Sequence, residues 1–343
     1  MEEHKLQSVI IISGSDAPSF CYYNAVIAGL TRNPHTQEIA GQARNDEVMP
    51  AKILEKSIEF CSRHQLSATI LYSSAFAEQH SRLADDFPHI KVVSSDTMSK
   101  CDFSTESDFV VMEDTSPATF ENFNEKHKHN IILRLNLAEA KRLPLMVYRH
   151  HRLFRRLNVV FKDVPDATED TLNRFRIDIQ PLKEVMFELF RSGNLFELNM
   201  VTDRMVLSGV NSCNAGISHI TIAPDGKFYI CPAFYYHNEY GAVGDLETGV
   251  HIANAQLLQF EYAPLCKLCD CFQCKRCVFL NKRMTHELNT PSHQQCVLSH
   301  HERNLSGMLL QKLQNRGTLT DIKEIPPLYH LDPADIYRDK ELS

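Results

Sequence analysis

Cysteine is concentrated in one part of this chain, and that crowding constrains its fold more than any other feature. Eight of the eleven cysteines lie between residues 213 and 296. Five of them fall in the run from Cys266 to Cys277, which reads CKLCDCFQCKRC. A hydrophobic core does not need so many thiols, because another small apolar side chain would pack as well. Thiolates that converge from short loops are typical ligands of a soft metal centre.

The rest of the composition is that of an ordinary globular protein. The chain has 343 residues, 43% hydrophobic and 23% charged, which suits one large α/β domain and a smaller one. Its net charge of −7 argues against nucleic acid or an anionic membrane as a main partner. The first residues show no secretory signal, and the apolar runs are too short to span a bilayer. We therefore expect a cytoplasmic protein, in which disulfides rarely persist.

Short β-branched runs alternate with helical patterns over the first 200 residues. Strands are predicted at 9–13, 68–72, 91–94, 109–113, 131–136, 158–162 and 197–200. Helices are predicted at 51–64, 118–129 and 170–191, the last with a break at Pro181 and a C-cap at Gly193. This α/β order predicts right-handed crossovers and a parallel sheet that closes, fully or partly, into a TIM-type barrel. Reactive groups of such barrels lie at the carboxyl ends of the strands.

The composition changes after about residue 205. A hairpin is predicted at Pro224-Asp225-Gly226, a helix returns near 298–315, and a proline-containing tail begins at Ile325. We therefore expect three parts. These are a barrel at 1–205, a cysteine-rich domain at 206–304, and a C-terminal helix with an extended tail at 305–343.

The cysteine spacing resembles that of one known domain. The pattern is Cys213-x12-Gly226-x4-Cys231, then Cys266-x2-Cys269-x4-Cys274-x2-Cys277, then eighteen residues to Cys296. Together with the hairpin text IAPDGKFYICP it is similar to the SPASM domain. That domain is the auxiliary iron–sulfur domain of radical SAM enzymes that modify peptides and proteins. The family usually spaces its last cysteines as C-x5-C-x3-C, and each of these intervals is one residue shorter here.

The resemblance implies two iron–sulfur clusters of the 4Fe–4S type. One would be held by Cys213, Cys231 and Cys277, and the other by Cys266, Cys269, Cys274 and Cys296. His219 is a candidate fourth ligand of the first cluster, although a histidine within a strand is the simpler interpretation. Cys271 is an additional thiol that could replace Cys269 or Cys274. Structural zinc remains an alternative, because C-x2-C pairs bind zinc equally well.

The N-terminal part departs from the radical SAM pattern. Radical SAM enzymes carry C-x3-C-x2-C after the first strand, whereas Cys21 has no companion at those spacings. We therefore do not expect S-adenosylmethionine as a cofactor. With the segment SFCYYN around Cys21, the chain is similar to the CXXX repeat peptide maturases, which are degenerate radical-SAM-like proteins associated with small cysteine-repeat precursor peptides. Cys21 is the candidate catalytic residue, as a redox or thiol-exchange group, and a buried structural thiol is the alternative.

These observations predict an iron–sulfur protein that binds and modifies a ribosomally synthesised, cysteine-containing peptide without conventional radical SAM chemistry. One alternative is a non-catalytic escort that presents the peptide to a second maturation enzyme. Another is a zinc-stabilised binding module. The basic run from Arg149 to Arg156 could receive an acidic leader peptide, or could be a solvated helix face. Polar residues at strand ends are candidates for a pocket at the barrel rim: Glu113, Asp114, Arg134, Asn136 and Lys162.

Overall fold

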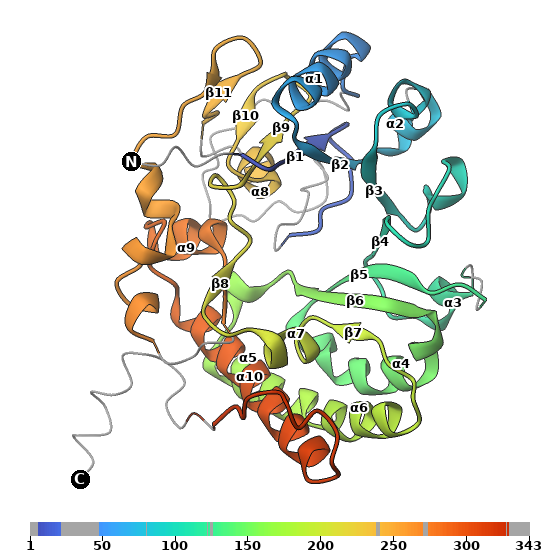
Figure 1. Cartoon of the computed structure of the whole chain (residues 1–343), viewed down its shortest axis with the longest axis vertical. Helices are drawn as coiled ribbons and strands as arrows, with labels where there is room; N and C mark the ends of the chain where they lie inside the picture. Colours follow the sequence, from blue (N-terminus) through green and yellow to red (C-terminus); the bar gives the residue numbers. More distant parts are fainter. Residues whose placement is uncertain are drawn as a thin grey trace, which may run out of the picture. The chain divides into compact units, whose positions relative to one another are not determined.

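The computed structural model describes residues 6–21, 48–79, 81–121, 123, 126–237, 241–269, 274–326 and 328. The chain divides into two compact units (Figure 1). The first unit comprises Met1–Val111 and Asn214–Ala255, and the second comprises Met112–Cys213 and Gln256–Ser343. Within the described ranges, no helix combines the length and the hydropathy needed to cross a membrane. The domain boundaries near residues 205 and 304 and the cytoplasmic location stay predictions.

A mostly parallel sheet forms the centre of the first unit, and every neighbouring pair in it is parallel except β9 and β10. In spatial order its strands are β10 (Phe228–Tyr229), β9 (His219–Ile222), β1 (Ser8–Ile12), β2 (Ser67–Leu71), β3 (His89–Ser94) and β4 (Phe109–Met112). The unit also contains α1 (Ala51–His64), α2 (Ser74–Gln79), α8 (Pro232–His237) and the ribbon β11 (Gly244–Asp245) with β12 (Gly249–Val250).

The strands of this sheet form where the sequence has β-branched runs. Four of the five residues of β1 are buried, because a parallel sheet is covered on both faces and its strands are continuously apolar. The helix predicted at 51–64 is confirmed as α1, which buries Leu54 and Cys61 and ends at Gln65 in the left-handed conformation. Local sequence pattern was therefore sufficient for this part of the fold.

The hairpin predicted at Pro224-Asp225-Gly226 is also confirmed. Its place in the sheet of the first unit was not predicted. β9 and β10 pair on either side of Gly226, whose φ of +76° favours glycine at this turn. A Cβ added at Gly226 would lie 3.3 Å from Cδ1 of Ile53, so the turn also packs closely on α1. Because β9 pairs in parallel with β1, this hairpin belongs to the first sheet.

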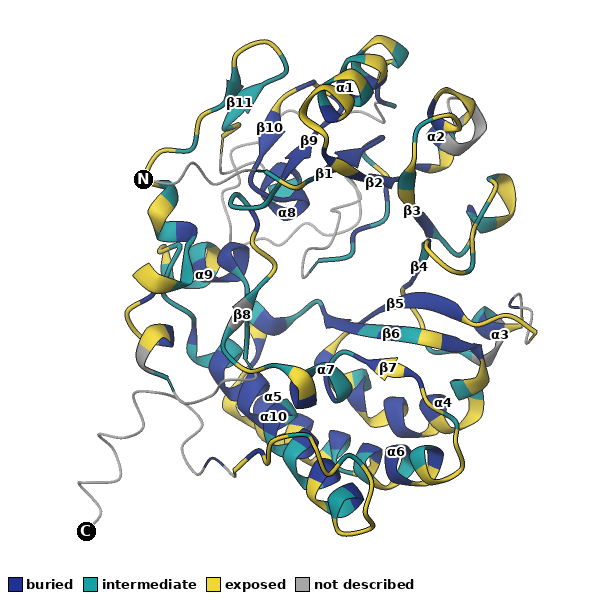
Figure 2. Ribbon diagram, in the orientation of Figure 1, coloured by how far each residue is buried: buried dark blue, intermediate teal, exposed yellow. Residues whose placement is uncertain are grey.

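The second unit contains the parallel strands β5 (His129–Leu135), β6 (Phe154–Phe161) and β7 (Glu197–Leu198), in that order. All seven residues of β5 are buried, and the strand is dark blue throughout in Figure 2. A two-stranded pair joins β8 (Asn211–Ser212) to β13 (Lys275–Arg276). The helices are α3 (Pro117–Phe120), α4 (Leu143–His150), α5 (Glu169–Ile179), α6 (Pro181–Arg191), α7 (Thr202–Val206), α9 (Val278–Thr285) and α10 (His293–Gln314).

Two helix predictions in this unit have different outcomes. Pro181 does divide the predicted helix, because proline lacks an N–H and fits the first position of α6. The helix predicted at 118–129 is wrong, since α3 ends at Phe120 and β5 already begins at His129. Phe120 instead stacks on His150 at 4.3 Å between ring centroids, and Phe123 packs edge-on against His129. Phe120 and Phe123 therefore pack on different elements and do not form one face of a helix.

Stability should fall in acid because of a histidine on α10. His301 is 4% exposed, and burial, together with the positive charges of Arg176 and His300, lowers its pKa to about 4. The unfolded chain then binds a proton near pH 6.5 that the folded chain binds only near pH 4, so stability is lost as the pH falls through this window.

Chemical unfolding at pH 7 and pH 4 measures this effect. Between pH 7 and pH 4 the free energy of unfolding decreases in both proteins. We expect this decrease to be about 3 kcal/mol smaller in His301→Gln than in the unmodified chain. The exposed His127 offers the control, because His127→Gln should leave the fall unchanged. Equal pH dependence in all three proteins would show that His301 does not titrate in this way.

Candidate metal centre

Four of the predicted cysteine ligands line one pocket of the second unit. Cys266 begins the short 3-10 helix η8 (Cys266–Leu268), and the N–H of Cys269 donates to its carbonyl at 3.2 Å. Cys274 directly precedes β13, and Cys296 lies in the first turn of α10. Cys266, Cys269, Cys274 and Cys296 contribute to the wall of the same pocket. This is the set that the SPASM resemblance implies for one cluster, and Cys271 lies outside the described residues.

The pairing of β8 with β13 brings together two further candidate ligands. Arg276 is opposite Ser212 in the parallel register, so the residues that follow them, Cys277 and Cys213, are neighbours. Electrostatic interaction between these two thiols is consistent with that placement. Cys231 and His219, the other candidates for this cluster, belong to the first unit. The structure therefore groups two of these four residues.

The first-unit candidates occupy ordinary structural positions. Cys231 is 6% exposed and directly precedes α8. His219 begins β9, and burial lowers its pKa to about 4. Cys21 is partly buried after β1, and its N–H donates to Oγ of Ser19 at 3.2 Å. Residues 22–24 of the segment that resembles the peptide maturases lie outside the described residues.

The pocket thiols suit a metal centre in their chemistry. Burial, together with the neighbouring Cys274, raises the pKa of Cys266 to about 12. Burial also raises the pKa of Cys277 to about 12. Both side chains are therefore neutral thiols without a metal, and a bound ion would displace their protons. Among the described residues, no three candidate ligands lie close enough together to hold a single ion. The four sulfurs share a pocket, and they are ligands that iron and zinc both accept.

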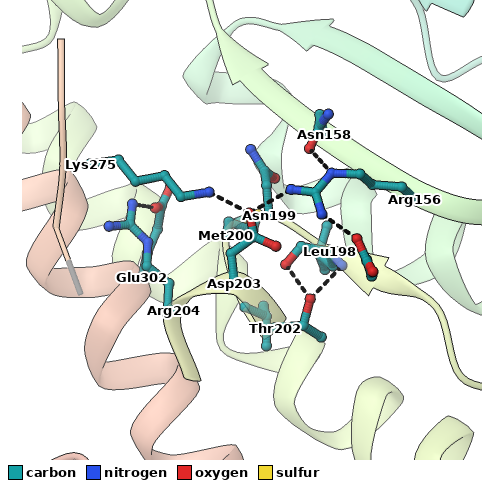
Figure 3. Close-up of polar contacts among 12 residues, drawn as sticks. Arg156, Asn158, Leu198, Asn199, Met200, Thr202, Asp203, Arg204, Lys275 and Glu302 are labelled. Carbon is teal, nitrogen blue, oxygen red and sulfur yellow. Dashed lines mark hydrogen bonds and ion pairs between the residues drawn. The ribbon is translucent and has the colours of Figure 1, made fainter. Parts of the chain in front are cut away.

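An ion-pair network holds the cysteine segment in place, and sequence reasoning missed it. Asp203 on α7 accepts from Nζ of Lys275 at 2.5 Å and from Nη2 of Arg156 at 2.6 Å (Figure 3). Arg156 also pairs with Glu197. Because Lys275 directly follows Cys274, Asp203 links that cysteine to α7 and β6. The sequence does place two adjacent cations, Lys275 and Arg276, between cysteines. This pattern could have indicated that acidic partners lie near the cysteine segment.

A second polar cluster lies where strands end. Glu113 follows β4, Arg134 is the penultimate residue of β5, and Lys162 follows β6. Glu113 pairs with Arg134, and with Nζ of Lys162 at 2.9 Å. The strand-end pattern therefore identified three residues that do meet. The other two stabilise local turns, since Asp114 accepts from the N–H of Ser116 and Asn136 caps η3 (Leu137–Arg142).

The basic run does not form a single helix face. It begins at the end of α4, passes through the 3-10 turn η4 (His151–Leu153) and enters β6. Arg149, Arg152 and Arg155 are exposed, whereas Arg156 is held by Glu197 and Asp203. Binding of an acidic leader by this run stays a prediction.

Comparison with known proteins supports the fold class. No protein-family model matches the sequence, and a search of curated proteins found no match either. The structure of hexahistidine-tagged anSMEcpe with bound AdoMet matches with a TM-score of 0.58 and 11% identity, over 90% of this chain and 99% of that chain. Native anSMEcpe with bound AdoMet and the Cp18Cys peptide gives a TM-score of 0.56 and 12% identity, over the same shares.

At this identity the likeness shows the fold alone. The mixed α/β architecture with mostly parallel strands is consistent with a radical-SAM-like, TIM-type fold, as the sequence predicts. The SPASM-like character of the cysteine-rich part stays a prediction.

Proposed function

We propose that this chain takes part in the maturation of a ribosomally synthesised, cysteine-containing peptide and holds an iron–sulfur centre in its second unit. The fold it shares with anSMEcpe supports the first part, because native anSMEcpe has been solved with AdoMet and the Cp18Cys peptide bound. The observation that carries the second part is the pocket lined by Cys266, Cys269, Cys274 and Cys296.

In such a centre, some residues of the second unit would be ligands and others would position them. Cys266, Cys269, Cys274 and Cys296 would hold one cluster, while Cys213 and Cys277 would contribute to a second. Asp203 fixes the backbone beside Cys274 through Lys275. When bound, a thiolate-ligated cluster supplies one-electron transfer at a potential set by its surroundings. Cys21 remains our candidate for direct reaction with the peptide.

Mass spectrometry of a peptide incubated with the protein tests this function. The probe is a synthetic peptide of repeated Cys-x-x-x units, incubated with anaerobically purified protein and a reductant, with and without S-adenosylmethionine. We expect the mass of the peptide to change without S-adenosylmethionine, and the Cys21→Ser variant to lose that change. A peptide with serine in place of cysteine is the control and should keep its mass.

The other outcomes separate the alternatives. A mass change that requires S-adenosylmethionine would contradict our expectation about that cofactor, which anSMEcpe does bind. Tight binding with an unchanged mass would identify a peptide escort. Absence of both binding and modification would contradict the proposed function as a whole.

A further inference from the structure

A buried arginine lies among the thiols of the second unit. Arg276 is on β13, between Cys274 and Cys277, and only 4% of it is exposed. It contributes to the wall of the same pocket as Cys266, Cys269, Cys274 and Cys296. Arginine is seldom this deeply buried unless an anion accompanies it. Its position therefore requires a partner for the positive charge.

The contacts of the guanidinium group satisfy its hydrogen bonds only in part. Nη2 donates to the carbonyl of Leu258, and Nη1 donates to the carbonyl of Gln259 at 3.3 Å. Nε is buried and has no hydrogen-bond partner among the described residues. Both acceptors are neutral, and within the described part of the chain no carboxylate forms an ion pair with Arg276.

Thiols surround this charge in the pocket, whose wall Arg276 shares with Cys266, Cys269, Cys274 and Cys296. The electrostatic partners of Arg276 are, in order of strength, Cys266, Cys213, Glu261 and Cys277. Leaving a buried guanidinium without a counter-charge costs several kcal/mol. Glu261 contributes one negative charge without forming an ion pair, and metal-bound thiolates in the pocket wall would bring further negative charge to this position. Four thiolates exceed the positive charge of a 4Fe–4S core, so the complete centre is an anion.

We propose that Arg276 is the counter-charge of the thiolate centre and donates its free Nε–H to a ligand sulfur. The two carbonyl contacts hold the guanidinium group in place, and the pairing of β13 with β8 fixes its backbone. A cation at this position stabilises the reduced, more negative cluster and raises its reduction potential. Arg276 is thus a positioning residue that tunes the centre, a role that rests on the proposed iron–sulfur function.

Redox titration of anaerobically purified protein, followed by electron paramagnetic resonance, tests this role. In Arg276→Met we expect the ratio of reduced to oxidised cluster at a fixed potential to fall about tenfold, which corresponds to about 59 mV for one electron. We expect this change in reduction potential for the cluster whose paramagnetic resonance signal is absent in Cys266→Ala. Arg276→Lys keeps the charge and should retain most of the potential.

The matched control is Lys267→Met, which removes the same charge from the residue next to Cys266. Lys267 is exposed, so solvent screens it and its loss should leave the potential nearly unchanged. If Arg276→Met loads iron and sulfide fully and titrates like the unmodified protein, the proposal is wrong. If Arg276→Met does not bind iron and sulfide, Arg276→Lys decides between the explanations. Full iron and sulfide in Arg276→Lys would support the need for a positive charge. Equal loss in both variants would contradict it. Unmodified protein without iron and sulfide would instead refute the proposed centre itself.

Discussion

Replacing Cys266 and Cys296 together by alanine should remove about half of the bound iron and acid-labile sulfide, because one of two four-iron clusters loses two of its four thiolates. Both side chains are 7% exposed and line one pocket with Cys269 and Cys274. They come from separate elements, η8 and α10. The two remaining thiolates are too few to retain a cubane cluster. Iron and sulfide analysis of anaerobically purified protein provides the measurement.

A buried thiol of the first unit provides the control for this experiment. Cys61 lies on α1, where burial raises its pKa to about 12, and it packs as a small apolar side chain. Cys61→Ala should keep the full iron and sulfide content. Unchanged iron in the double variant, or an equal loss in Cys61→Ala, would contradict the assignment of the pocket as a cluster site.

Asp203→Asn should destabilise the second unit by about 2–3 kcal/mol, because it leaves the partly buried cations Lys275 and Arg156 without their shared carboxylate. The side chain of Asp203 is 17% exposed. Burial acts to raise its pKa, but the hydrogen bonds and charges of Lys275 and Arg156 outweigh burial and hold the pKa below the usual range. Chemical unfolding at pH 7 measures the loss.

Another carboxylate on the same arginine supplies a matched control. Glu197 pairs with Arg156 but is 63% exposed, so solvent screens the interaction. Glu197→Gln should therefore cost less than about 1 kcal/mol. A loss in Glu197→Gln as large as that in Asp203→Asn would show that burial does not distinguish these two ion pairs.

Much of the secondary structure could be predicted because local pattern determines it. The β-branched runs gave strand positions within a few residues, and Pro181 marked the break between α5 and α6. The helix predicted at 118–129 is wrong because Phe120 and Phe123 are held by tertiary contacts. Their actual partners, His150 and His129, come from other elements and are invisible to a local pattern.

The candidate site was predictable in its thiols but not in its charges. The resemblance to the SPASM domain implied that Cys266, Cys269, Cys274 and Cys296 form one set, with Cys271 as a possible replacement, and these four residues line one pocket. Metal binding by these residues stays a prediction. The roles of Asp203 and Arg276 depend on tertiary contacts with distant segments, so sequence spacing alone could not identify them.

Metal analysis of the unmodified protein tests the central claim most directly. The protein is purified without oxygen, and iron, acid-labile sulfide and zinc are counted per chain. We expect about eight iron and eight sulfide per chain, the content of two 4Fe–4S clusters, with little zinc. Stoichiometric zinc without acid-labile sulfide would contradict the account and would identify the cysteine-rich part as a zinc-stabilised binding module.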